Sequence, residues 1–409
     1  MSDVSVLEVL LHGRKIGTFT WLQGDRSIFS FTQDYIDDPN RPVLSLSFKD
    51  SLGELRTEFK PVRQRIEPFF SNLLPEGPLR DYLAARAGVK SVREFFLLRA
   101  LGRDLPGALA IRPAEGKAGP PDTDEDSAAE DRHDKNTLRF SLAGVQLKFS
   151  ALQNKDKHGG LTIPADGVGG AWIVKLPADR FEGVPENEFA MMTLAQKIGI
   201  DIPEIALIAP EAIEGLPDGI GALKGKALAI RRFDRTDKGP VHIEDFAQVF
   251  GVYPDDKYSR GSYRNIAYVL GIETDEASVK EFIRRLVFST LIGNADMHLK
   301  NWSLIYPDGR TAKLSPAYDL LSTIPYIPDE TAALKYARIK RMSEMSYGEL
   351  AYLAAKARLP EKPVLDTARE TVDRFRGLWA QEKTHLDLPK AVITAIDDHL
   401  GRLRILKEK

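Results

Sequence analysis

The sequence predicts an α+β protein with an N-terminal α+β unit and a mainly helical C-terminal lobe. Three observations support this fold class. The chain of 409 residues exceeds the usual size of a single hydrophobic core. Strand-like and short helical segments are mixed through its first two thirds, whereas helical periods dominate from Glu276 onward. An acidic stretch without large apolar residues separates the first unit from the rest.

Residues 1–113 are expected to form the N-terminal unit. Two runs rich in β-branched and aliphatic residues, Val4–Leu11 and Ile16–Leu22, predict strands joined by a turn. From about Pro68 the apolar period changes to that of short amphipathic helices, which proline and glycine residues separate. Strands followed by helices within one stretch of this length predict a single α+β unit.

Residues 114–137 form the acidic stretch. They contain eight acidic and three Lys or Arg side chains. Such a segment cannot bury enough apolar surface to offset the entropy lost on ordering. We therefore expect a flexible, solvated linker and assign it no chemistry.

The remaining chain divides into a mixed part, residues 138–270, and a helical part, residues 271–409. In the helical part only one interlude, around residues 302–328, departs from the helical pattern. The clearest predicted elements are buried strands at Trp172–Leu176 and Ala227–Ile230, a helix at Asn187–Ile198, and almost continuous helix over residues 361–409.

Composition excludes several classes of protein. A net charge of −2 gives no overall attraction to nucleic acid. The absence of cysteine removes disulfide scaffolds, Cys-ligated metals and thiol catalysis. The seven histidines show no HExxH spacing, and neither GxSxG nor GxGxxG occurs. No secretory signal layout or apolar run of about 18 residues is present, so we expect a cytoplasmic protein.

The segment around Asp296 carries the strongest catalytic signal. Asp296 and Asn301 have the D-x-x-x-x-N spacing of the catalytic loop of protein kinases. There the aspartate orients the nucleophilic hydroxyl, and the asparagine oxygen reaches a magnesium ion. Lys300 between them can neutralise charge on the transferred phosphoryl group. On spacing alone, a helix-end turn capped by an Asx side chain explains these residues equally well.

Two further charged residues fit a kinase-like site. Asp319 lies downstream, where such sites need their main magnesium ligand, although it also suits the N-cap of a helix. Lys175 ends a predicted buried strand, where a kinase lysine meets the α- and β-phosphates; a lysine at a strand edge is the alternative. Glu188, on the next predicted helix, is the candidate ion-pair partner of Lys175, and Glu186 competes with it.

The segment from Ser141 to Ser150 precedes the predicted lysine strand, where a phosphate-covering loop belongs. Its one glycine, Gly144, does not make a P-loop, and no GxxxxGK[ST] sequence exists in the chain. Backbone N–H groups near Gly144, together with Lys148, are candidates to hold phosphate oxygens.

Together these residues resemble the HipA family of serine/threonine kinases, the toxins of bacterial HipBA-type toxin–antitoxin modules. The matches follow the family order across residues 141–322, and residues 1–113 resemble the family's N-terminal subdomain. The matching segments are Ser141-Leu-Ala-Gly-Val-Gln-Leu-Lys148, Ile173-Val-Lys-Leu-Pro177, Arg232-Phe-Asp-Arg235, His242-Ile-Glu-Asp-Phe-Ala-Gln248, Gly293-Asn-Ala-Asp-Met-His-Leu-Lys-Asn301 and Tyr318-Asp319.

The resemblance implies a two-lobed protein-kinase-like fold and transfer of the ATP γ-phosphate, with Mg2+, to a serine of a cytoplasmic protein. The expected target is a translation factor or an aminoacyl-tRNA synthetase, and the expected outcome is growth arrest and persistence. The implied partner is a helix-turn-helix antitoxin of the HipB type, which binds operator DNA. Direct DNA contact by this chain would come only from local basic clusters. The clearest is Arg338–Arg341, for which a solvated helix face is the stronger interpretation.

The resemblance also implies roles for individual residues. Asp296 matches the catalytic base, Asn301 and Asp319 match the magnesium ligands, and Ser141 matches the inhibitory autophosphorylation site. Arg231 to Phe233 match the hinge at the adenine. The implied nucleotide-binding residues are Ala143, Gly144, Val145, Gln146, Lys148, Lys175, Arg231, Arg232, Phe233, Asp234, His298, Asn301, Tyr318 and Asp319.

Two departures from the family pattern bear on nucleotide binding. Leu147 stands where the family often has an acid, and Arg231 replaces a frequent hinge glutamate. Two other functions remain open at this point. A HipA-like regulatory module would bind an antitoxin without catalysis, but it would need none of the retained polar residues. A small-molecule kinase would share the same phosphoryl-transfer residues.

Overall fold

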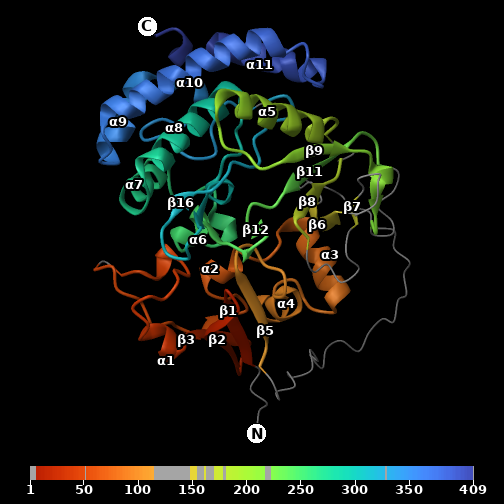
Figure 1. Ribbon diagram of the computed structural model, residues 1–409, viewed down its shortest axis with the longest axis vertical. Helices are drawn as coiled ribbons and strands as arrows, with labels where there is room; N and C mark the ends of the chain where they lie inside the picture. The colour runs from red at the N-terminus through yellow and green to blue at the C-terminus, as the bar shows by residue number, and fades with distance from the viewer. Residues whose placement is uncertain are drawn as a thin grey trace.

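The computed structural model describes residues 6–50, 52–114, 148–153, 161–162, 170–177, 181–216, 223–327 and 329–408. Figure 1 shows the N-terminal unit (residues 6–114) at one end of the molecule and the C-terminal helices at the other, with a mixed sheet region between them. The predicted α+β class is confirmed. The predicted linker at residues 114–137 lies, apart from Ala114, outside the described residues.

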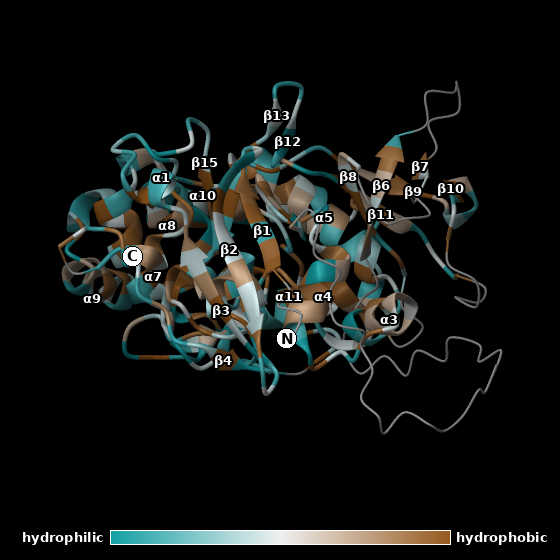
Figure 2. Cartoon of the chain, turned by 90° about the horizontal axis from the view of Figure 1, so that it is seen from below, coloured by the Kyte–Doolittle hydropathy of each residue, from teal (hydrophilic) through white to brown (hydrophobic). Residues whose placement is uncertain are grey.

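The N-terminal unit contains a five-stranded antiparallel sheet in the order β4-β3-β2-β1-β5. The first two strands fall where the sequence predicted them. In Figure 2 the interior strand β1 carries mostly hydrophobic colours, in keeping with its largely buried side chains. The strands are β1 (Val6–Leu11), β2 (Arg14–Leu22), β3 (Arg26–Phe31), β4 (Val62–Arg63) and β5 (Leu109–Pro113).

Short helices cover this sheet and close a core of its own, rich in phenylalanine. Phe19, Phe29, Phe48 and Phe70 are almost fully buried, and their rings pack edge-on, tilted or stacked against one another. The helices are α1 (Gln33–Ile36), η1 (Leu46–Phe48), α2 (Pro68–Ser71), α3 (Gly77–Ala87) and α4 (Glu94–Leu101).

A six-stranded mixed sheet follows, in the order β10-β7-β6-β8-β11-β9. Helix α5 (Val184–Ile198) packs against β9 and β11 and ends at Gly199, as the sequence predicted. The register pairs Lys148 with Lys175 across β6 and β8. The strands are β6 (Lys148–Gln153), β7 (Leu161–Thr162), β8 (Trp172–Lys175), β9 (Ile205–Ile208), β10 (Ile213–Glu214) and β11 (Ala227–Arg231), with η2 (Pro210–Ala212) before β10.

Two smaller sheets connect this region to the helical part. The hairpin of β12 (Arg235–Thr236) and β13 (Gly239–Pro240) leads into a three-stranded antiparallel sheet in the order β14-β15-β16. Its hydrogen bonds join residues on both sides of position 270, where the sequence analysis divided the chain. The remaining strands are β14 (His242–Asp245), β15 (Ser303–Tyr306) and β16 (Lys313–Leu314), and α6 (Phe246–Val249) follows β14.

The helical part forms the end of the molecule opposite the N-terminal unit (Figure 1). Helix α10 packs along α8 and also contacts α5 and α9, so one large core joins the helices to the sheet region. No helix among the described residues combines the length and apolar character needed to cross a bilayer. The elements are η3 (Pro254–Asp256), α7 (Tyr263–Glu273), α8 (Glu276–Leu291), η4 (Leu299–Asn301), η5 (Met342–Glu344), α9 (Tyr347–Lys356), α10 (Glu361–Glu382), α11 (Lys390–Arg402) and η6 (Arg404–Leu406).

The non-helical interlude is longer than residues 302–328, so that prediction was too narrow. From residue 292 to residue 346 the described chain holds only short strands and 3-10 turns. Leu334 and Tyr336 are buried in this stretch, but an irregular chain carries them into the core, where the Tyr336 hydroxyl bonds Thr290 Oγ1 at 2.7 Å. Apolar residues held by such tertiary contacts need not follow a helical period.

Candidate active site

The end of strand β8 brings three charged residues together. Lys175 Nζ lies 2.6 Å from Glu188 Oε1 on α5 and also forms an ion pair with the Asp319 carboxylate. Burial alone would lower the pKa of Lys175, but the two carboxylates outweigh it and raise that pKa, so the lysine stays charged. Lys175 and Glu188 form the pair that the sequence analysis expected. Its competitor, Glu186, instead accepts a hydrogen bond from the Lys226 amide at 2.9 Å.

The predicted catalytic loop follows helix α8. Gly293 turns the chain with a φ of +67°, and a Cβ there would lie 2.4 Å from Ile324 Cδ1, so a larger residue would be strained and would displace the Ile324 side chain. The Asn301 side-chain Nδ2 donates to the Asp296 carbonyl at 2.8 Å, which folds the loop back on itself. Burial raises the pKa of Asp296. Its Oδ1 accepts a hydrogen bond of 2.6 Å from the Tyr258 hydroxyl.

Asn294 connects this loop to Asp319. Its Oδ1 accepts from the Asp296 amide at 3.0 Å, and its Nδ2 donates to the Asp319 carbonyl at 3.3 Å. Asp319 has a φ of +54°, a left-handed conformation that is uncommon for residues other than glycine. Strained backbone of this kind clusters at functional sites, where the surrounding contacts must hold it. The structure therefore brings Asp296, Asn301, Asp319 and Lys175 into one region.

Asn301 and Asp319 offer oxygen atoms suited to a hard cation. Because the Asn301 Nδ2 donates to a carbonyl, its Oδ1 is the atom left to bind a metal. No group of three or more His, Asp or Glu side chains in the described part of the chain could hold a metal ion. These residues fit a magnesium ion whose other ligands come from nucleotide phosphates and water.

Lys300 contacts the N-terminal unit. Its Nζ lies 2.6 Å from Glu76 Oε1 and donates to the Asn72 carbonyl at 2.9 Å. The other oxygen of Glu76 pairs with Lys257 at 2.7 Å. Burial would raise the pKa of Glu76, but the two ammonium groups lower it to about 2.

His298 and Tyr318 flank the loop. Burial lowers the pKa of His298 to about 3, so its ring is neutral, and it packs edge-on against Tyr258 with centroids 4.9 Å apart. The Tyr318 hydroxyl donates to the Lys300 carbonyl at 2.9 Å. The Tyr318 ring lies 5.9 Å from that of Phe233, which lines a hollow of about 280 Å³ beside the predicted hinge.

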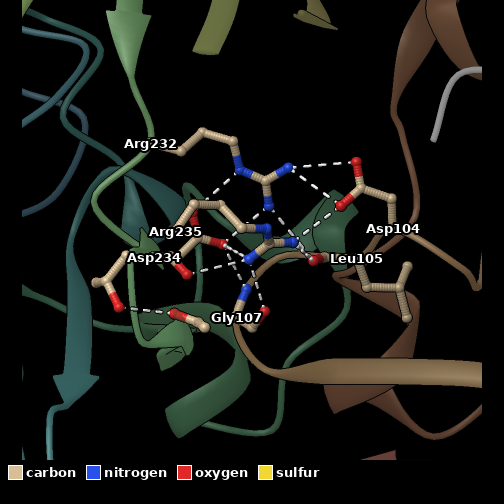
Figure 3. Close-up of polar contacts among 8 residues, drawn as sticks. Asp104, Leu105, Gly107, Arg232, Asp234 and Arg235 are labelled. Atoms are coloured by element: carbon tan, nitrogen blue, oxygen red, sulfur yellow. Dashed lines mark hydrogen bonds and ion pairs between the residues drawn. The ribbon is translucent and has the colours of Figure 1, made fainter. Parts of the chain in front are cut away.

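The other predicted hinge residues make different contacts. Arg231 is exposed and pairs with Glu204 at 3.3 Å. Arg232 and Asp234 belong to a buried group that we call the hinge network, together with Asp104 and Arg235. Figure 3 shows the two guanidinium groups between the carboxylates of Asp104 and Asp234. Nucleotide contact by Arg232 or Asp234 stays a prediction.

The hinge network joins the two units of the chain. Asp104 comes from the N-terminal unit and lies 2.9 Å from Arg235 Nη2. Gly107, from the same loop, donates its amide to Asp234 Oδ2 at 2.8 Å, and its carbonyl accepts from Arg235 at 2.8 Å. Two acids and two arginines thus balance their charges within a buried contact.

Ser141, Ala143, Gly144, Val145 and Gln146 lie outside the described residues. Of the predicted phosphate loop, only Lys148 is reached, as the first residue of β6, where the register pairs it with Lys175. In the basic cluster, Arg338 is engaged by Glu349 at 2.8 Å and by the Tyr352 ring.

Sequence reasoning missed four residues that complete the site: Asn294, Tyr258, Glu76 and Asp104. Asn294 stands within the matched Gly293–Asn301 segment, where an Asx residue in a turn was the available signal. Nothing in the sequence marks the other three, because their partners lie far away along the chain. The separation is 38 residues for Tyr258 and Asp296, 128 for Asp104 and Arg232, and 181 for Glu76 and Lys257.

Comparisons with known proteins agree with this geometry. Residues 140–379 match the model of the HipA-like C-terminal domain, and residues 7–112 match that of the HipA N-terminal domain. The chain is 62% identical over 409 residues, 99% of the relative's length, to Y4dM of Sinorhizobium fredii, which its name classes with the kinases.

A sequence and a solved structure from Shewanella oneidensis also match. The serine/threonine-protein kinase toxin HipA is 29% identical over 297 residues, which cover 64% of each chain. The fold matches a chain in the solved complex of HipA, HipB and operator DNA, with a TM-score of 0.73 at 23% identity, over 97% of this chain and 96% of that one. The domain matches and the full-length identity to Y4dM show that the chain belongs to the HipA family of kinases.

Proposed function

We propose that this HipA-family kinase is a serine/threonine-protein kinase toxin of a type II toxin–antitoxin system. It transfers the γ-phosphate of ATP to a serine of a cytoplasmic protein. The observation that carries the proposal is the linked arrangement of Lys175, Asp319, Asn294 and Asp296, in which a charged lysine and two carboxylates are held at one site. A pure binding module needs none of these polar groups.

The proposed reaction is an in-line phosphoryl transfer. The serine hydroxyl oxygen bonds to the γ-phosphorus, the bond from that phosphorus to the β-phosphate oxygen breaks, and ADP leaves with the electron pair. Asp296 orients the hydroxyl and takes its proton. Lys175 turns from Asp319 to the α- and β-phosphates, while Glu188 keeps the lysine in place. Lys300 offers positive charge to the transferred group.

Asn301 and Asp319 would hold Mg2+, which would screen the phosphate charges when bound. Three further groups would bind the nucleotide. The adenine would lie at Arg231–Phe233, with Arg232 and Asp234 supporting this segment from the hinge network. His298 and Tyr318 would contact the nucleotide from the catalytic side. The phosphates would meet the segment from Ala143 to Lys148.

Ser141 is the proposed autophosphorylation site. A phosphate there would add about −1.5 to −2 charge to the segment that must cover the ATP phosphates, and like-charge repulsion would weaken nucleotide binding.

We further propose an antitoxin of the HipB type as partner, through which the chain reaches operator DNA. The solved Shewanella complex contains HipA, HipB and operator DNA, which supports the antitoxin and the operator as partners.

The decisive experiment compares the full chain with its Asp296→Asn variant. The amide keeps the shape of the side chain but cannot accept the proton, so phosphate incorporation and growth arrest on overexpression should disappear while ATP binding remains. Mass spectrometry of the wild-type protein should find phosphate on Ser141. If the variant phosphorylates itself or a target at the original rate, the assignment of Asp296 is wrong. A chain that binds ATP but never transfers phosphate would instead be a regulatory module.

A further inference from the structure

The N-terminal unit contacts the proposed catalytic loop through the Glu76 side chain and the Asn72 carbonyl. Glu76 precedes helix α3, and its two carboxylate oxygens pair with different lysines, Lys300 at 2.6 Å and Lys257 at 2.7 Å. Lys300 is further fixed by the Asn72 carbonyl. Both lysines have side chains that are four-fifths or more buried. A flexible ammonium stem held by two acceptors loses most of its freedom, so Glu76 restricts where the charge of Lys300 can lie.

The second lysine leads to the catalytic carboxylate. Lys257 adjoins Tyr258, and the Lys257 carbonyl accepts a hydrogen bond from the Leu299 amide of the catalytic loop at 3.3 Å. The Tyr258 hydroxyl donates to Asp296 Oδ1 at 2.6 Å, and its ring packs against His298. A carboxylate accepts on both oxygens, so a bond to Oδ1 leaves Oδ2 for an acceptor hydroxyl.

We propose that Glu76 is a positioning residue for phosphoryl transfer: it fixes Lys300 directly and, through Lys257 and Tyr258, fixes the orientation of the Asp296 carboxylate. The inference rests on the proposed function and extends it, because it makes the N-terminal unit a part of the catalytic site. A catalytic group whose rotamer is locked by its neighbours reaches the reactive geometry without further loss of entropy.

The test measures ADP formation by the full chain at saturating Mg2+ and ATP, with a serine-containing peptide as the acceptor of the phosphoryl group. Calorimetry determines the ATP affinity separately. Glu76→Ala and Tyr258→Phe should each lower kcat roughly tenfold, the typical effect of one hydrogen bond to a charged group. Glu76→Gln, which keeps one acceptor but no charge, should lose less. The affinity for ATP should not change in any of these variants, because none of the altered contacts belongs to the proposed nucleotide-binding residues.

Matched controls separate positioning from general stability. Glu67→Gln removes an acid of the same unit that pairs with Arg56 at 2.9 Å, and Tyr352→Phe removes a hydroxyl on α9; both should keep the original kcat. The double variant Glu76→Ala/Tyr258→Phe should lose less than the product of the single losses, because Glu76 acts partly through Tyr258. If Glu76→Ala fails to fold, Glu76→Gln carries the test.

Three results would overturn the inference. The first is an unchanged or higher kcat in Glu76→Gln and Tyr258→Phe. The second is a loss of ATP affinity and melting temperature in proportion to kcat, which would indicate a purely structural contact. The third is multiplicative losses in the double variant. Asp296→Asn, run alongside, distinguishes this failure from that of the proposed function: normal turnover in Asp296→Asn refutes the function, whereas an inactive Asp296→Asn with a normal Glu76→Gln refutes only the positioning role.

Discussion

Buried acidic side chains lie at two places where the N-terminal unit contacts the rest of the chain. The partners of these acids differ between the two places. In the hinge network, Asp104 and Asp234 face two arginines. In the second place, which we call the Glu244 cluster, no cation from the described part of the chain pairs with the Glu244 carboxylate. Its hydrogen-bond donors are the hydroxyls of Ser45 at 2.6 Å and Tyr306 at 2.5 Å and the Leu46 amide at 3.0 Å.

The difference determines how each contact responds to pH. In the hinge network, burial opposes the charge of Arg232, but the adjoining carboxylates raise its pKa, so the pairing persists across the physiological range. In the Glu244 cluster, burial raises the pKa of Glu244 to about 7, because neutral donors compensate the charge only in part. One interface therefore combines a contact that is insensitive to neutral pH with one that titrates near it.

Breaking the hinge network should have the largest effect. Asp234→Asn leaves two buried guanidinium groups with one carboxylate, so the free energy of unfolding should fall by about 3–5 kcal/mol. Urea denaturation at pH 7 measures this change. The control is Glu273→Gln, which removes the more exposed pair with Lys49 between the same two units and should cost less than about 1 kcal/mol. Equal losses in both variants would mean that Asp234→Asn does not leave an uncompensated buried charge.

Glu244→Gln should sharpen the comparison through its pH dependence. The folded state has a pKa of about 7 at Glu244, above the roughly 4.3 of an unfolded chain. Between these values the folded state holds a proton that the unfolded state releases, so the contribution is present below about pH 4 and lost as pH rises through 7. The original chain should therefore lose about 3 kcal/mol relative to Glu244→Gln between pH 4 and pH 8.5.

The measurement is the difference in unfolding free energy between the two proteins at each pH. Buried His242 titrates in the opposite sense, since burial lowers its pKa to about 4, but it is present in both proteins and cancels. A difference that stays constant from pH 4 to pH 8.5 would show that Glu244 does not change its proton occupancy on folding.

Ser45→Ala should have the smallest effect, about 1–2 kcal/mol at pH 5, where it removes a hydrogen bond to a protonated acid and the cap of the Ser47 amide. The loss should grow at pH 8.5, because the Ser45 bond lowers the pKa of Glu244 and its removal raises that pKa further. Thermal unfolding at both pH values gives the comparison, with Ser30→Ala on the exposed side of β3 as the control. A loss that is the same at both pH values would argue against coupling between Ser45 and the titration.

Much of the fold and of the site could be predicted from local patterns. Strands β1, β2, β8 and β11 and helix α5 follow from apolar periods and end signals, since burial of one face imposes those periods. The pairing of Lys175 with Glu188 follows because a lysine at the end of a buried strand needs a nearby acid. The spacing of Asp296 and Asn301 likewise reflects a loop that closes on itself.

What could not be predicted depends on contacts between distant parts of the chain. The sequence predicts Arg232 and Asp234 as hinge residues, and nothing near them in the sequence indicates that Asp104 forms an ion pair with Arg232. From the sequence, Lys300 is a cation without an assigned partner, and only the fold shows that Glu76 lies beside it. Tyr258 carries no periodic or motif signal, because its role depends only on the position of one hydroxyl relative to Asp296.

Gly107 has a consequence for how the two units can be recombined. Its φ is +76°, and a Cβ there would lie 2.8 Å from the Ile243 amide nitrogen and 3.0 Å from His242 Nδ1. At this point the units meet closely: Gly107 lies against the main chain of Ile243 and the buried ring of His242, which leave no room for a side chain. An N-terminal unit taken from a relative with a larger residue here cannot dock at the same spacing. The two units are thus not interchangeable modules: they must be inherited, or transplanted, as a matched set.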